Sequence, residues 1–212
     1  MSARDQEVKQ KLVESALKLF AEHGRDRVSV RQIAAEAGVT HGSIRHYFGT
    51  KDNLYIAALT QPGLQIPFED PQGAADVPLS REEAEQYLRR FVRRFVGFQA
   101  KVGEDNVAAL GLMQAEVSRD GGPDPVFYKQ IIRPGHEHLK TIVSRIRPDI
   151  TDDKVLEILT FNIIFQCVMI RIARRTIPKL LRTRRVTKRD LALIADLIVS
   201  VTLGGLRAFD VD

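Results

Sequence analysis

The sequence predicts an all-α protein with an N-terminal three-helix helix-turn-helix domain and a larger helical domain after it. Apolar residues recur at spacings of three and four through most of the 212 residues, which is the period of an amphipathic helix. No segment has a convincing strand pattern. Prolines and glycines are concentrated at 61–79, as in a connection between two packed parts. We therefore expect domains at 1–60 and 80–212, with 61–79 as the linker.

Glycines and hydroxyl side chains mark the helix ends of the first domain. The first helix presents an apolar face from Val8 to Phe20 and ends at Gly24, because glycine tolerates the left-handed backbone just past a helix. Ser29 is a suitable N-cap for a short second helix, and Gly38 ends that helix. We expect the short helices of this domain at about 30–37, 40–47 and 51–59.

The second domain has equally clear helix ends. Ser80 and Glu83 have the form of a capping box, and Thr187 with Asp190 in the first turn supports the start of the last helix. Pro134 should kink or break the helix that contains it. The expected helices lie at about 80–101, 106–117, 126–147, 153–175 and 188–208.

The composition excludes several classes of protein. Hydrophobic residues at 44% and charged residues at 28% are ordinary for a globular chain and exclude a disordered one. The longest apolar stretch, at 161–170, is far shorter than the roughly 20 residues of a membrane span, so no membrane partner is expected. Cys167 is the only cysteine, which excludes internal disulfides and cysteine-based zinc sites. Because the N-terminus has no apolar secretory segment, we expect a cytoplasmic protein.

The segment 30–49, VRQIAAEAGVTHGSIRHYFG, fits a helix-turn-helix. Ala34 is small enough for two helices to cross, and Gly38 can take the positive φ that the turn needs. The apolar residues that should lock the second helix onto the first are Ile33, Val39 and Ile44. This geometry places a recognition helix in a DNA major groove, whereas the alternative is an ordinary helical hairpin of a bundle.

From Gln10 to Leu59 the chain resembles the DNA-binding domain of the TetR family of bacterial transcriptional regulators. The matching runs are KLVESALKLFAEHG and VSVRQIAAEAGVTHGSIRHYFGTKDNLYIAAL. Further on, SRDGGPDPVFYKQIIRPGHEHL, FQCVMIRIARR and LGGLRAF resemble the C-terminal domain of CecR-type members. The resemblance implies a homodimer that binds double-stranded operator DNA, represses transcription, and carries a ligand-binding and dimerisation domain for a small-molecule effector. It implies association with the nucleoid and no cofactor.

The resemblance also assigns DNA contacts to individual residues. Ser29 and Arg31 should meet a phosphate at the start of the second helix. Tyr47 and Lys51 should hold the DNA backbone. The residues expected in the groove are Thr40, His41, Gly42, Ser43, Arg45 and His46. The family usually has tyrosine at the position of Arg45, so this arginine either replaces a phosphate contact or reads a guanine edge.

Aromatic residues at helical spacing suggest where an effector would bind. Such stripes are typical of a core, but in this family a subset can line an apolar pocket with a few polar groups. The expected lining residues are Phe91, Phe95, Met113, Phe127, Phe161, Phe165 and Gln166. A second apolar stripe predicts pairing of the last two long helices with those of a partner chain. The expected interface residues are Ile158, Leu159, Ile194, Leu197, Ile198, Val201 and, where backbones approach, Gly204 and Gly205.

The remaining features carry no chemistry of their own. His136 and His138 are two residues apart and therefore point to different faces of a helix, so no metal site is predicted. No catalytic motif is present, and we expect no enzyme. Nine basic residues and no acid lie between Arg171 and Arg189, as a solvated face, an acidic-effector site or a membrane-surface patch. The alternative function is a small-molecule-binding or membrane-surface protein in which the helix-turn-helix is only scaffolding.

Overall fold

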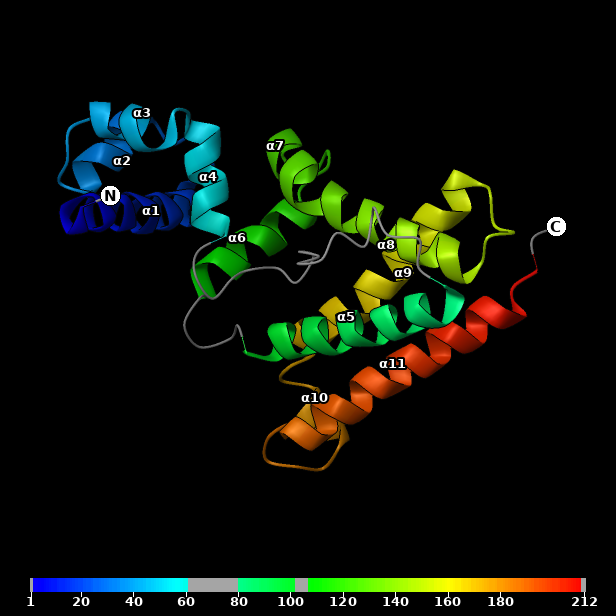
Figure 1. Cartoon of the computed structure of the whole chain (residues 1–212). Coiled ribbons are helices and arrows are strands. Elements are labelled where there is room, and N and C mark those ends of the chain that lie inside the picture. Colours follow the sequence, from blue (N-terminus) through cyan, green and yellow to red (C-terminus); the bar gives the residue numbers. More distant parts are fainter. Residues whose placement is uncertain (1, 61–79, 102–106, 211–212) are drawn as a thin grey trace. The chain divides into compact units, whose positions relative to one another are not determined.

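The computed structural model describes residues 2–60, 80–101 and 107–210, and every regular element within them is helical (Figure 1). This confirms the all-α prediction. The linker expected at 61–79 lies outside the described residues. The elements are α1 (Ala3–His23), α2 (Val30–Glu36), α3 (Gly42–Phe48), α4 (Lys51–Leu59), α5 (Arg81–Lys101), α6 (Val107–Val117), α7 (Pro125–Phe127), a π-helical turn (Tyr128–Ile132), α8 (Arg133–Ile146), α9 (Asp153–Ile172), α10 (Ile177–Leu180) and α11 (Lys188–Ala208).

The chain forms two compact units, and their composition differs from the division expected at 61–79. Unit 1 comprises Met1–Gln65 and Glu104–Ile131, and therefore holds α1 to α4 together with α6 and α7. Unit 2 comprises Ile66–Gly103 and Ile132–Asp212, and holds α5 and α8 to α11. Two helices that we assigned to the second domain thus belong to the unit of the helix-turn-helix, because α6 packs on α1 and α4.

Local signals account for the helices of unit 1. Capping boxes start α1 at Ser2 and α2 at Ser29, and the Thr50 side chain accepts the Asn53 N–H at the start of α4. The apolar face of α1 is buried, and its Phe20 ring meets the Tyr55 ring of α4 edge to face at 5.3 Å between centroids. Helices α1 and α4 therefore share one core, on which α6 also packs.

An ion-pair group ties the loops of unit 1 together. We call it the Arg25 cluster: Arg25, Asp26, Asp52, Asp124 and Arg119. The Arg25 guanidinium donates to Asp52 at the start of α4 and, at 2.5 Å, to Asp124, the N-cap of α7. Asp26 accepts from Arg119 at 2.8 Å. Burial opposes the charge of Arg25, but the carboxylates of Asp52 and Asp124 outweigh it and raise the pKa of the guanidinium.

The core of unit 2 is built from α5, α8, α9 and α11. Helix α5 contacts the other three, and the side chains between them form one buried apolar cluster that includes Cys167. Burial raises the pKa of the Cys167 thiol to about 12, as expected for a small core residue rather than a reactive thiolate. His136 and His138 bond to different partners, the Thr160 hydroxyl and the Tyr87 hydroxyl, in agreement with their expected placement on different faces.

The helix expected at 126–147 is interrupted just before Pro134. A π-helical turn precedes α8, and Pro134 occupies the second position of α8. In a continuous α-helix the proline ring would clash with the carbonyl of Gln130, four residues earlier, and one hydrogen bond would be lost. A π-helical turn widens the backbone at this point. The expected break is therefore confirmed, and it consists of the π-helical turn at Tyr128–Ile132, which precedes the proline.

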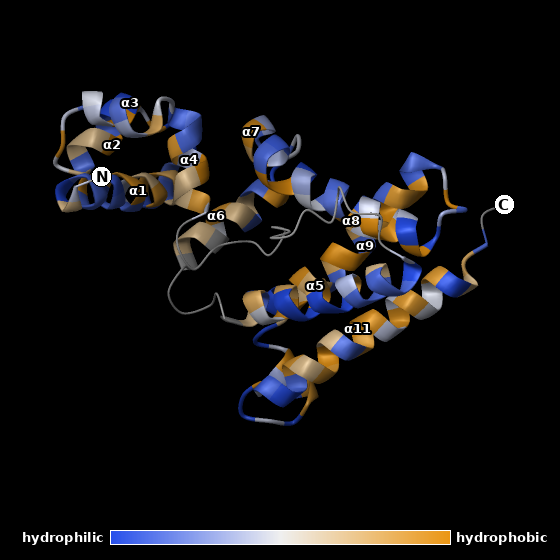
Figure 2. Ribbon diagram, in the orientation of Figure 1, coloured by the Kyte–Doolittle hydropathy of each residue, from blue (hydrophilic) through white to orange (hydrophobic). Residues whose placement is uncertain are grey.

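Helices α9 and α11 are rich in apolar residues (Figure 2), and the core of unit 2 does not cover all of their side chains. By length and composition alone, both helices could cross a membrane, but the same is true of core helices in soluble proteins. One face of α9 is buried through Leu156, Ile163 and Cys167. The opposite face of α9 carries large apolar side chains that are about half exposed or more: Ile158, Phe161, Phe165 and Ile172. Helix α11 carries three such side chains: Leu193, Leu197 and Val201.

The segment that connects α9 and α11 is rich in cationic side chains. We call residues 174–189 the basic segment; it contains eight Lys or Arg residues and no acid. All eight side chains are exposed, and none forms an ion pair within the described ranges. Helix α10 lies inside this segment and was not expected from the sequence, and its Leu180 is 74% exposed.

Candidate nucleic-acid interface

Helices α2 and α3 form the expected helix-turn-helix. Ala34 is 2% exposed at the crossing, and its carbonyl accepts the Val39 N–H at 3.0 Å across the turn. Gly38 has φ 65°, a conformation that side chains other than glycine rarely adopt. Ile33 and Ile44 are buried between the two helices and the core. The backbone and the apolar contacts therefore fix α3 on α2 as the sequence predicts.

The outer face of α3 presents polar groups. Gly42, Arg45 and His46 are exposed, and Ser43 is half-buried, with its hydroxyl 3.1 Å from that of Thr40. His41 is exposed just before the helix and makes no side-chain cap. A Cβ at position 42 would meet nothing closer than the Thr40 hydroxyl at 4.0 Å, so the fold itself does not require glycine there. A glycine that the fold does not need leaves room for another molecule.

The residues expected at phosphates differ in how free they are. Arg31 is exposed at the start of α2, whereas the Ser29 hydroxyl donates to the Gln32 side chain at 2.8 Å and accepts the Gln32 N–H. Lys51 is half-buried in the first turn of α4, and burial and the nearby Arg25 charge lower the pKa of its ammonium. Lys51 is thus held within the unit, and only part of its side chain faces solvent.

Tyr47 makes a contact that the sequence did not reveal. Its hydroxyl donates to Oδ1 of Asp5, in the first turn of α1, at 2.8 Å. Asp5 Oδ2 accepts the backbone N–H of Ser2 at 2.9 Å, which completes the capping box of α1. The pattern Ser-x-x-Asp in residues 2–5 signals a helix start, but nothing in it indicates a partner 42 residues away.

The residues expected around an effector are divided between the two units. Phe91 and Phe95 lie in the core of unit 2, whereas Met113 and Phe127 are buried in unit 1. Phe161 and Phe165 stack on each other at 5.8 Å on the exposed side of α9, and Gln166 bonds to the neighbouring Asn162. Phe161 and Phe165 therefore do not lie with Phe91 and Phe95 in the core of unit 2, and their part in an effector site stays a prediction.

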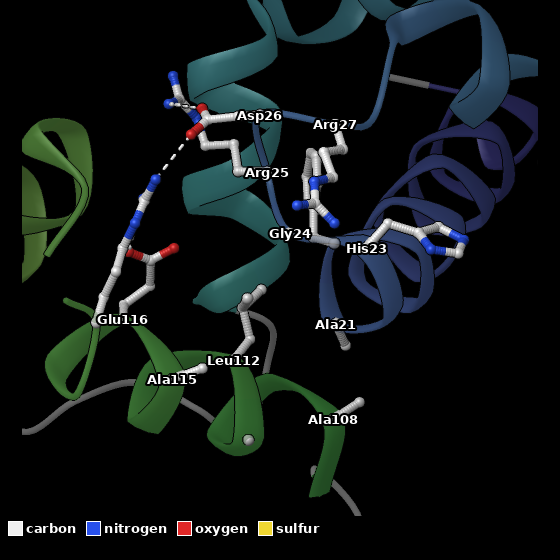
Figure 3. A pocket seen from close by; sticks show the side chains of 13 residues that line it. Ala21, His23, Gly24, Arg25, Asp26, Arg27, Ala108, Leu112, Ala115 and Glu116 are labelled. Atoms are coloured by element: carbon white, nitrogen blue, oxygen red, sulfur yellow. Dashed lines mark hydrogen bonds and ion pairs between the residues drawn. The ribbon is translucent and has the colours of Figure 1, made fainter.

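Unit 1 contains a cavity of about 560 Å³ that was not expected (Figure 3). It lies between the end of α1, the loop that follows it, and α6. Small and apolar side chains such as Ala21, Ala108 and Leu112 contrast with charged ones such as Arg27 and Glu116 in its lining. None of the seven residues expected around an effector lines it.

The residues expected at a dimer interface fall on two sides of their helices. Ile158, Leu197, Val201, Gly204 and Gly205 are exposed and free to meet another chain. Leu159, Ile194 and Ile198 instead pack into or against the core of unit 2. Residues 194, 197, 198 and 201 have the i, i+3, i+4, i+7 spacing of one helical stripe. Its 194 and 198 edge packs on the core of unit 2, and its 197 and 201 edge faces solvent.

Comparison with known proteins shows where the chain belongs. The family model of bacterial regulatory proteins of the TetR family matches residues 12–58. The model of the C-terminal domain of the transcriptional dual regulator CecR matches residues 84–208, more than half of the chain. The chain belongs to the TetR family. Its C-terminal part is of the CecR type, and the family consists of transcriptional regulators rather than enzymes.

Several relatives of this TetR-family chain are known. The dual regulator CecR of Shigella flexneri is 24% identical over 190 residues, which cover 86% of this chain and 83% of that protein. The repressor AcnR of Corynebacterium glutamicum is 41% identical over 49 residues, covering 23% and 26% of the two chains. The solved structure of SmeT, the repressor of a Stenotrophomonas maltophilia multidrug efflux pump, has a TM-score of 0.56 at 15% identity and covers 93% of this chain and 89% of its own. SmeT has also been solved in complex with triclosan, with a TM-score of 0.55 at 17% identity and coverage of 92% and 90%.

Proposed function

We propose that this TetR-family regulator is a homodimeric repressor that binds a near-palindromic operator and is released from it by a small-molecule effector. The observation that carries the proposal is the outer face of α3. It combines exposed Arg45 and His46 with a glycine that the fold does not require, on a helix locked by Ile44 and the Gly38 turn. Side chains of this kind on a helix of this size can reach base edges in a major groove.

Two groups of residues have separate roles in this proposal. Phosphate contacts position the protein without reading sequence, and we assign them to Ser29, Arg31, Tyr47 and Lys51. Base contacts are assigned to Thr40, His41, Ser43, Arg45 and His46, with Gly42 allowing close approach. Replacement of Arg45 by alanine should cost about 1–3 kcal/mol at one base pair if it reads guanine. Equal weakening on every sequence would instead assign Arg45 to a phosphate.

The dimer is proposed from the uncovered apolar face of α9 and α11. Ile158, Phe161, Phe165, Leu197 and Val201 together leave a large apolar surface in water, which is typical of a protein–protein contact. Two-fold pairing through it would present two recognition helices to half-sites about 34–36 Å apart. The variant Leu197→Asp with Val201→Asp should sediment as a monomer and lose operator affinity, whereas Leu180→Asp, at a leucine that is more exposed than either but lies on α10, serves as the control.

Effector release is the part of the proposal that rests on relatives. The triclosan complex of SmeT shows that a repressor with this fold can hold an apolar ligand. In the present chain the candidate residues that remain inside unit 2 are Phe91 and Phe95, which stack at 5.5 Å. An effector acts only if it prefers the state that does not fit the operator, and coupling of about 1–3 kcal/mol is typical.

The decisive experiment is selection of bound sequences from random duplex DNA by the full chain. A recovered palindrome with half-sites one helical turn apart is the expected result. Recovery of no preferred sequence, with only salt-sensitive binding to all duplexes, would contradict the assignment of α3 as a reader of bases. Addition of candidate apolar compounds to the selected complex then tests release.

A further inference from the structure

We infer that Asp5 is a built-in competitor of the DNA backbone: its carboxylate accepts the Tyr47 hydroxyl in the place of a phosphate and thereby lowers affinity for duplex DNA. The inference rests on the proposed function, because it assumes that Tyr47 contacts a phosphate when DNA is bound. It adds a residue on α1, outside the helix-turn-helix, that sets the strength of binding.

The Tyr47 hydroxyl has one proton to donate, and in this structure it donates that proton to Asp5. The Tyr47 hydroxyl lies 2.8 Å from Oδ1 of Asp5, a charged acceptor at an ordinary hydrogen-bond distance. A phosphate oxygen can accept the same proton only if this bond opens. The contact is half-exposed rather than buried, so an incoming phosphate could reach it without unfolding the unit.

Asp5 is held in place independently of Tyr47. Its other oxygen, Oδ2, accepts the Ser2 N–H at 2.9 Å and the Ser2 hydroxyl at 3.0 Å. The carboxylate therefore stays beside Tyr47 when the hydroxyl turns away, and its negative charge remains next to the bound phosphate. These capping contacts, together with the Tyr47 bond, lower the pKa of Asp5, so the competitor is charged at neutral pH.

The surroundings of the pair suit an anion other than Asp5. The Lys9 ammonium lies 5.8 Å from the centre of the Tyr47 ring, and the exposed His46 ring packs edge to face on Tyr47 at 4.7 Å. Both groups lie beside the ring that carries the hydroxyl, and the charge of His46 also acts on Asp5. In the free protein the negative charge next to the Tyr47 hydroxyl is the carboxylate of Asp5.

The experiment measures DNA affinity of the full chain by fluorescence anisotropy, on a selected operator and on a random duplex of equal length. Asp5→Asn should bind both duplexes about three- to tenfold more tightly than the wild type, because one negative charge is removed and a neutral amide is a weaker acceptor. The gain should be the same for both duplexes, since phosphate contacts carry no sequence information. It should shrink as salt is raised.

Two further variants separate competition from general charge. Glu7→Gln removes an acid from the same end of α1, where Glu7 pairs with Lys11 at 2.8 Å and forms no hydrogen bond with Tyr47 in the described part of the chain, and reports the effect of net charge. In a Tyr47→Phe background, Asp5→Asn should gain no more than Glu7→Gln does, because there is no hydroxyl to release. Asp5→Ala, checked for an intact α1 by circular dichroism, should bind at least as tightly as Asp5→Asn.

The outcomes are distinct. An Asp5→Asn variant that binds DNA no more tightly than the wild type, or more weakly, overturns the inference and makes Asp5 a residue that prepares Tyr47 for phosphate. An equal gain in the Tyr47→Phe background also overturns it. If the wild-type chain binds no duplex at all, the proposed function fails together with the inference.

Discussion

The Arg25 cluster and the basic segment are both rich in arginine, but the arginine side chains have opposite surroundings in the two regions. In the Arg25 cluster of unit 1, a guanidinium that is only 15% exposed is surrounded by Asp26, Asp52 and Asp124. In the basic segment of unit 2, none of the eight cations forms an ion pair with a carboxylate of the described residues. Arginine in the first region is therefore part of the scaffold, whereas in the second it contributes charge to the surface and little to the fold.

The difference teaches what an ion pair contributes at each degree of burial. An exposed cation is hydrated and screened, so its removal changes stability by tenths of a kcal/mol. A buried pair behaves differently, because deleting one partner leaves the other charge without water and without a counterion. Asp124 is the residue that would be left in this state if Arg25 were removed, since its side chain is only 3% exposed.

The largest effect is expected for Arg25→Met, which keeps most of the side-chain length and removes the charge. Asp124 would then be buried without its cation, and we expect a loss of about 3–5 kcal/mol in the free energy of unfolding. Urea denaturation followed by circular dichroism measures it. A loss below about 1 kcal/mol would mean that Arg25 contributes no more than an exposed arginine does.

A smaller loss is expected for Asp124→Ala, because this residue is both a partner of Arg25 and the N-cap of α7. Its Oδ1 accepts the N–H groups of Val126 at 2.8 Å and Phe127 at 3.4 Å. We expect a loss of about 1–3 kcal/mol. Asp124→Asn keeps the capping oxygen and removes the charge, so the difference between the two variants separates the cap from the ion pair.

In the basic segment, removal of arginines should raise the free energy of unfolding rather than lower it. Arg184→Gln with Arg185→Gln removes two cations that repel their neighbours, and we expect a stability gain of at most about 0.5 kcal/mol at low salt, lost at high salt. The matched control is Arg119→Gln in unit 1, where the same change removes a 2.8 Å pair with Asp26 and should destabilise. Destabilisation in both cases would show that the basic segment has partners of its own.

The smallest effect concerns acid. The hydrogen bond from Arg119 lowers the pKa of Asp26 below its ordinary value of 3.8. A carboxylate whose folded pKa is depressed stabilises the fold above its unfolded pKa, and this contribution is lost as pH falls through the folded value. Between pH 5 and pH 2.5 the wild type should therefore lose slightly more stability than Asp26→Asn. A steeper loss in the variant would contradict this sign.

The sequence allowed prediction where structure is determined locally. Helix starts follow from Ser29, Ser80 and Thr187 because an N-cap depends on residues only three positions apart. The helix-turn-helix follows for the same reason, since Ala34 and Gly38 act within one turn. The Arg25 cluster could not be predicted, because Asp52 and Asp124 are 27 and 99 residues away in the chain.

The aromatic residues show a second limit of sequence analysis. Helix α9 is apolar on two faces, with Ile163 and Cys167 buried on one and Phe161 and Phe165 exposed on the other. Spacing identifies residues that share a face but cannot tell which of two apolar faces meets the core. The prediction therefore assigned to a pocket two side chains that the structure places on the outside.

The capping residue of α2 has a consequence for how this protein meets a polyanion. Three other capping boxes use an acid at the third helical position: Asp5 in α1, Glu83 in α5 and Asp190 in α11. In α2 the same place is taken by Gln32, whose amide oxygen accepts the Ser29 N–H at 2.8 Å. The amide closes the cap without a formal charge and does not titrate. The helix end expected to approach DNA thus has no acid in its first turn, and an acid at position 32 would have repelled the phosphate that Ser29 and Arg31 are expected to bind.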